Sequence, residues 1–413
     1  MKSEIKFKRS GSDIAFTIYF TIMACLYTAT YIQLAAQIGI ILYVLFSRFK
    51  VSMNVVKNEL FLLRWFGFLA LLALFSTQWA YSTKTGSNTI LTFFRILAIA
   101  AVMFLYVNSY ERALAVLKSY IISSVIMAAV ALATTPLAQY GQAGEEGFGD
   151  AIGQQRNTLG AVMVFCAFMS YVLAQRGDFP FGKFFCAFSV VTIFCTGSRG
   201  AILQLMIIML VFILMQNDLR KLVPYIFGII IAVPIIIALV QAVPFLYETV
   251  WVRIENLFLT VTGVDVEADS SARGRELYKV LAGQMFRERP WIGYGVDGFY
   301  CMLRDVRFVE GVYLPPVYSH CNYTELASCF GIVGLVIWYL PVVQVLIGSF
   351  VQRKVSNEMK AIFAMLFSMI ILDYARIPWM THISMYYYFC LFLLYFYSEK
   401  DKSKTLSTKI IIQ

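Results

Sequence analysis

Charged residues are scarce in this chain. Only 14% of its 413 residues are Asp, Glu, Lys or Arg, whereas 60% are hydrophobic. A soluble domain of this length could not bury so much apolar surface, so the composition excludes a soluble globular protein and predicts a polytopic helical membrane protein. The net charge of +10 is interpreted as orienting the chain in a membrane rather than as binding nucleic acid.

Patterns that hold metals or cofactors are also missing. The chain has two histidines, His320 and His382, and eight cysteines without a CxxC pair. No His, Asp or Glu cluster has metal-ligand spacing, and we therefore expect neither a metal nor a cofactor. Cys301 and Cys321 share one loop, where they could form a disulfide or remain free, because sequence does not give their separation. A structural role is favoured for His382.

Basic residues gather at alternate ends of the apolar segments. They lie in residues 2–9, 48–57, 112–118, 176–183, 220–221 and 353–360 and in the tail after 399, whereas the intervening short loops have few. This positive-inside pattern predicts that both termini are cytoplasmic. The first apolar segment lacks a convincing small-residue cleavage site, so we expect it to be retained as a span.

The predicted fold is an all-α polytopic membrane protein with about 12 transmembrane helices. The expected spans are 13–31, 33–48, 60–80, 88–107, 112–134, 157–175, 181–196, 199–217, 221–242, 322–348, 358–375 and 381–398. Residues 1–242 would hold helices 1–9, residues 243–321 one large extracytoplasmic loop, and residues 322–413 helices 10–12 and a cytoplasmic tail. No large internal repeat is visible, which disfavours a transporter built from duplicated halves.

The large loop contains a segment with helical spacing, from 275 to 288. Its apolar residues Leu277, Val280, Leu281 and Met285 fall on one face, and Trp291 follows. This pattern predicts an interfacial helix with an aromatic anchor, or a helix that covers the top of the bundle. The following segment, 293–298, matches GxGxxG, but no strand precedes it, so a backbone turn is expected rather than a dinucleotide site.

Arginines from distant segments are predicted at the same outer level. Arg199 lies in the turn Thr-Gly-Ser-Arg-Gly, where it could clamp a phosphate or extend to lipid headgroups. Arg376 follows Asp373 and could instead form a structural ion pair with it. A cluster of this kind could bind pyrophosphate without a metal. The candidate arginines are Arg156, Arg199, Arg273, Arg275 and Arg376.

His320 is the candidate acid–base group. It lies in Tyr-Ser-His-Cys-Asn-Tyr at 318–323, where the loop ends and the next span begins. A titratable imidazole at a membrane boundary indicates a site where an anionic, lipid-linked substrate meets water. Its neighbours Tyr318, Asn322 and Glu325 are expected near the donor or the acceptor.

Across residues 150–380 the chain resembles the O-antigen ligase-like superfamily, which includes O-antigen and capsule polymerases. Each matching element is short, but the elements occur in the family's order. In the family the residue after the histidine is usually Asn, whereas here it is Cys321, with Asn322 next. Both Arg273 and Arg275 fit the arginine position, and the spacing to Pro290 favours Arg275. The matching elements are Arg-Asn-Thr-Leu-Gly at 156–160, Thr-Gly-Ser-Arg-Gly at 196–200, Gly274-Arg275, Arg-Pro-Trp-Ile-Gly-Tyr-Gly at 289–295, and His320 with Glu325, Gly331 and Gly334.

The resemblance implies a GT-C type glycosyltransferase on the outer face of the bacterial inner membrane. Its donor would be a glycan on undecaprenyl pyrophosphate, and its acceptor a glycan or a glycolipid. The arginines would hold the pyrophosphate, and His320 would orient or deprotonate the acceptor hydroxyl, with inversion at the anomeric carbon and without a metal.

Three functions remain open at this stage. A polysaccharide repeat-unit polymerase is the first choice, and a ligase that transfers the finished glycan to lipid A core is the second. A flippase for the lipid-linked glycan is the alternative from another class. It would require arginines buried in many spans, whereas Arg64 and Arg95 are the only clear cases within spans.

Overall fold

The computed structural model describes residues 11–26, 29–48, 60–82, 86–140, 147–216, 270–306, 308–309, 312–354, 356–380 and 382–411, with scattered residues between 234 and 255. The expected span 221–242 and most of the loop up to 269 lie outside these residues. Within them the chain is helical, apart from one antiparallel pair of two-residue strands, β1 (Phe308–Val309) and β2 (Val312–Tyr313).

Eleven of the expected spans coincide with helices. Four helices, α4, α5, α6 and α14 with the turn after it, are long and apolar enough to cross a membrane, and five apolar helices among the described residues are shorter. The total of twelve spans and the three-part division of the chain stay predictions. The helices are α1 (Gly11–Cys25), α2 (Thr30–Arg48), α3 (Leu60–Ser76), α4 (Ser87–Tyr106), α5 (Tyr110–Thr134), α6 (Arg156–Arg176), α7 (Gly182–Thr196), α8 (Arg199–Leu214), α12 (Ser270–Glu288), α13 (Gly298–Val306), α14 (Asn322–Val351), α15 (Asn357–Leu372) and α16 (His382–Ile411).

Serine hydroxyls define where three of these helices begin. Ser109, Ser198 and Ser356 each accept a hydrogen bond from the backbone N–H three residues later, at the start of α5, α8 and α15. A cap of this kind satisfies one of the backbone donors that the first helical turn leaves unpaired. The sequence therefore fixes the start of α8 at Arg199, directly after its cap.

Helix α16 lies at the centre of the bundle. It contacts α1, α4, α5, α6, α14 and α15, and its residues from Ile383 to Leu394 are buried on all sides. A helix that is apolar around its whole circumference can satisfy its surface only inside other helices. The first turns of α16 are therefore packed among the other helices at one end of the bundle.

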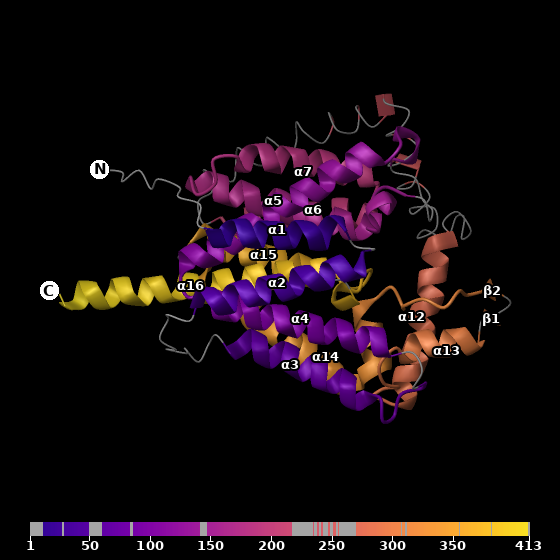
Figure 1. Cartoon of the computed structure of the whole chain (residues 1–413). Helices are drawn as coiled ribbons and strands as arrows, with labels where there is room; N and C mark the ends of the chain where they lie inside the picture. Colours follow the sequence, from indigo (N-terminus) through magenta and orange to yellow (C-terminus); the bar gives the residue numbers. More distant parts are fainter. Residues whose placement is uncertain are drawn as a thin grey trace.

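Helices α12 and α13, in the described part of the segment before α14, cover one end of the bundle. In Figure 1, α12 stands across the direction of the other helices at the end opposite to the C-terminal part of α16. Its buried stripe is Tyr278, Ala282 and Met285, which face the bundle, and α12 contacts α14. The expected apolar face was therefore partly wrong: Val280 is 53% exposed, because it lies on the opposite side of the helix from Ala282.

Backbone hydrogen bonds join residues 290–295 to α14. Helix α14 is broken at Gly331, which has φ 64 and ψ −157. The N–H groups of Tyr294 and Gly295 donate to the carbonyls of Ser328 and Cys329, and the N–H of Ile332 donates back to Pro290. The GxGxxG segment thus forms turns that pair with the break in α14.

None of the eight cysteines, including Cys301 and Cys321, forms a disulfide. Both of these thiols are buried. The disulfide alternative is therefore not realised.

Candidate active site

A cavity of about 290 Å³ lies under the large loop. Four residues proposed from the sequence line it together: Arg275 from α12, Tyr318 and His320 from the segment before α14, and Arg376 from the segment after α15. Its other walls are the start of α6 and the first turns of α16. The remaining lining residues are Gly153, Gln154, Gln155, Asn157, Thr158, Ala161, Ala375, Ile377, Pro378, Ser384 and Tyr387.

The other candidate residues lie outside this lining. Arg273 is exposed on α12, so Arg275 and not Arg273 faces the cavity. Arg156 is half-buried and begins α6, between two lining residues, and Arg199 is half-buried at the start of α8. Asn322 and Glu325 are buried in the first turn of α14.

The turn that holds Arg199 packs against the start of α6. The Ser198 hydroxyl donates to the Asn157 side-chain oxygen at 2.9 Å, and Asn157 lines the cavity. A Cβ on Gly160 would come within 2.8 Å of the Ala201 Cβ. The small residue at 160 therefore lets the arginine turn approach the cavity wall closely.

His320 is held in a strained position between two tyrosines. Its φ of 59 is left-handed, a conformation that few residues other than glycine adopt. The ring centroid lies 4.5 Å from that of Tyr318 and 5.7 Å from that of Tyr278. Burial lowers the pKa of His320 from 6.5 to about 4, and the positive charge of Arg275 adds to the effect. The imidazole is therefore neutral at physiological pH and able to accept a proton.

Glu325 supports the backbone beside His320 rather than lining the cavity. Its Oε2 accepts a hydrogen bond from the Ser319 N–H at 2.6 Å, and its Oε1 faces the Cys329 thiol at 3.8 Å. A buried side-chain oxygen that accepts a backbone N–H satisfies both polar groups. Glu325 therefore fixes the residue directly before the left-handed histidine.

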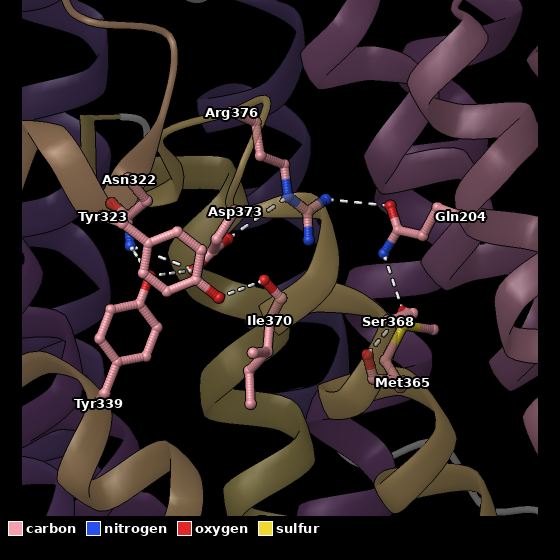
Figure 2. A network of polar contacts seen from close by, with 9 residues as sticks. All are labelled: Gln204, Asn322, Tyr323, Tyr339, Met365, Ser368, Ile370, Asp373 and Arg376. Atoms are coloured by element: carbon pink, nitrogen blue, oxygen red, sulfur yellow. Dashed lines mark hydrogen bonds and ion pairs between the residues drawn. The ribbon is translucent and has the colours of Figure 1, made fainter. Parts of the chain in front are cut away.

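Arg376 is oriented by groups from two other positions. Its Nη1 donates to Gln204 Oε1 at 3.0 Å, and its Nε lies 3.7 Å from Asp373 Oδ1 (Figure 2). The Nε and Nη2 atoms are buried and have no hydrogen-bond partner among the described residues. Buried guanidinium groups are usually paired. Arg376 thus retains unused donor capacity beside the cavity.

Asn322 takes part in the same polar network. Its side-chain amide donates to the Tyr339 hydroxyl at 2.8 Å and to Asp373 Oδ2 at 3.1 Å. The Tyr339 hydroxyl donates to Asp373 Oδ2 at 2.9 Å. These contacts fix the Asn322 side chain two residues after His320, and its expected place near the donor or the acceptor stays a prediction.

Several residues that line or support the cavity were not among those predicted from the sequence. Tyr278 lies one turn after Arg275 on the same face of α12, a spacing that does predict proximity. Asn157 lies in the matching element at 156–160, but no sequence pattern pointed to Gln155 or Gln204, because these residues approach the site only when the helices pack. The Tyr318 hydroxyl donates to Gln155 Oε1 at 3.4 Å, across the cavity wall.

The charge of the cavity restricts what it can bind. Among the described residues that line it, two are arginines and none is Asp or Glu. Two guanidinium groups beside a neutral imidazole suit an anionic group next to a hydroxyl that loses its proton. No group of three or more His, Cys, Asp or Glu that could hold a metal occurs in the described part of the chain.

Comparison with known proteins gives one match. Residues 184–339 match the family described as O-antigen ligase. The matched stretch contains Arg199, Arg275 and His320, whereas Arg376 lies beyond it. No curated protein matches the chain. This match and the apolar helices indicate a membrane protein that is similar to the O-antigen ligase family over residues 184–339.

Proposed function

We propose that the protein is a polysaccharide repeat-unit polymerase of the GT-C type. It would transfer a glycan from undecaprenyl pyrophosphate to a sugar hydroxyl of the next lipid-linked unit, on the outer face of the bacterial cytoplasmic membrane. The observation that carries this proposal is the cavity in which Arg275, Arg376 and His320 meet. These residues come from three separate segments of the chain.

Arg275 and Arg376 hold the pyrophosphate in this proposal. Their forked donors can each bind two phosphate oxygens, and they offset the negative charge that grows as the leaving group departs. Arg156 and Arg199, near the start of α6, would guide the rest of the lipid-linked anion to the cavity. The arginines supply the positive charge that many other transferases take from a metal.

His320 acts on the acceptor. Its neutral ring takes the proton of the acceptor hydroxyl while that oxygen forms a bond with the anomeric carbon of the donor. The bond between this carbon and the pyrophosphate oxygen breaks, and its electron pair leaves with undecaprenyl pyrophosphate. A single displacement of this kind inverts the anomeric configuration. Tyr318 and Tyr278 hold the ring in place.

A ligase is the second candidate, and the description of the matching family favours it. It would use the same donor and the same displacement, but transfer the finished glycan to lipid A core or another acceptor. The two functions differ in whether the product can serve as a donor again.

Reconstitution in liposomes tests the proposal. The purified protein is incubated with a synthetic undecaprenyl-pyrophosphate-linked repeat unit, with and without lipid A core. A ladder of products without the core supports the polymerase, and a single adduct that requires the core supports the ligase. Transport of the donor across the bilayer without any transfer would contradict both.

A further inference from the structure

Asp373 contacts both halves of the proposed site. It is the residue directly after α15 and is 1% exposed. Its Oδ1 lies 3.7 Å from Arg376 Nε, whereas its Oδ2 accepts from the Asn322 amide and the Tyr339 hydroxyl. Its main-chain carbonyl also accepts the Asn322 N–H at 2.7 Å.

These contacts connect Arg376 to the start of α14, the segment that follows His320. Arg376 lines the cavity on the side proposed for the leaving group, and Asn322 is the first residue of α14, two residues after His320. Figure 2 shows Asp373 between the Asn322–Tyr339 pair and the Arg376 guanidinium. A movement of Asp373 would therefore shift the arginine and the histidine segment relative to each other.

The chemistry of Asp373 fits a fixed link. Arg376 faces one oxygen of the buried Asp373 carboxyl group, while two donors occupy the other. Gln204 holds the far side of the guanidinium at 3.0 Å, and its own amide donates to the Ser368 hydroxyl at 3.3 Å. The guanidinium is thus fixed from α8 and α15 together, with Nη2 left unpaired.

We propose that Asp373 is a positioning residue that sets the distance between the leaving-group arginine, Arg376, and the acceptor-side histidine, His320. The inference rests on the proposed glycosyl transfer and goes beyond it, because Asp373 itself does not line the cavity. Attack of the acceptor oxygen and departure of the pyrophosphate occur in one step, so both groups must be aligned at the same moment.

The test compares Asp373→Asn with a matched control at the other end of the same helix. Glu358 is also a buried carboxylate on α15, and it pairs with Arg176 far from the cavity. We expect Asp373→Asn to lower kcat about 10- to 100-fold, as misalignment near a reacting centre does. The KM for the lipid-linked donor should not rise, because the change removes a negative charge beside Arg376. Glu358→Gln should lower thermal stability without changing kcat or KM per folded protein.

A double-mutant cycle shows whether Asp373 acts through Arg376. In an Arg376→Lys background, Asp373→Asn should cost less than about threefold in kcat, because coupled residues give non-additive losses. A full additive loss, or a single variant with normal kcat, would overturn the inference while leaving the transferase function intact. If the wild-type protein transfers no glycan, the proposed function fails and the inference fails with it.

Discussion

His320 and Arg275 lie in one cavity, where burial of the imidazole and then the charge of Arg275 lower the pKa of His320 to about 4. An unperturbed imidazole would titrate near 6.5. The cavity therefore keeps the proposed base neutral over a wider pH range, although it weakens it as a base.

The pH dependence of the reaction follows from this pKa. We expect kcat/KM for transfer to stay level from neutral pH down to about 5 and to fall through about 4, because the protonated ring cannot accept a proton. The profile is measured with the liposome assay at saturating acceptor. Arg275→Gln removes the second cause of the shift, so its acid limb should move toward neutral pH. An acid limb near 6.5 in the wild-type protein would contradict the buried setting of His320.

His320→Ala should abolish transfer but leave donor binding intact, because the arginines hold the pyrophosphate. Binding of undecaprenyl pyrophosphate by the purified variant checks the second part. His320→Gln separates two roles of the ring: substantial activity without an acid limb would mean that the ring only positions the acceptor. His382→Ala should have a mild effect, and normal transfer by His320→Ala would remove His320 from the mechanism.

Arg275 and Arg376 should each be intolerant of Lys as well as Ala, because Lys keeps the charge but loses the bidentate fork. Loss of one such donor pair should cost about 2–4 kcal/mol of transition-state stabilisation, or about 10²–10³ in kcat. Arg273→Lys is the control on the same helix, since Arg273 is exposed outside the cavity. A larger defect at Arg273 than at Arg275 would show that the wrong arginine of the pair had been assigned.

Adding one methyl group at Gly293 should disrupt the packing of the 293–298 turn against α14. A Cβ on Gly293, which has φ 60, would lie 2.5 Å from the Cys329 carbonyl carbon. We expect Gly293→Ala to destabilise the protein by roughly 2–5 kcal/mol through strain and overpacking. Gly177→Ala has similar strain, with φ 79, but nothing within 4 Å, so it should cost about 1 kcal/mol. Thermal unfolding in detergent compares the two variants, and equal melting temperatures would contradict the close pairing.

The orientation of the chain can be tested by thiol labelling. Gln284 on α12 and Asn357 at the start of α15 are exposed, so a single cysteine can be introduced at each position. In a cysteine-free background, an impermeant reagent added to intact cells should label position 284 and not 357, because the basic loops predict that α15 begins in the cytoplasm. The reverse pattern would invert the proposed topology.

Much of the fold follows from the sequence because its cause is local. Long apolar segments with basic residues at alternate ends predict helices in a membrane, and the structure places helices at eleven of the twelve expected segments. The expected span 199–217 begins at the same residue as α8, where the Ser198 side chain caps the N–H three residues later. The order of short motifs also indicated the family whose model matches residues 184–339.

Only the tertiary structure decided which of the candidate residues meet. The spacing to Pro290 favoured Arg275 over Arg273, but only the packing of α12 shows that Arg275 lines the cavity and Arg273 does not. The lowered pKa of His320 depends on its burial and on the charge of Arg275, and a sequence pattern gives neither. Asp373, read from sequence as a local partner of Arg376, also binds Asn322 across α14 and α15. Pairing of groups far apart in the chain is set by how helices pack, and a local pattern does not contain that information.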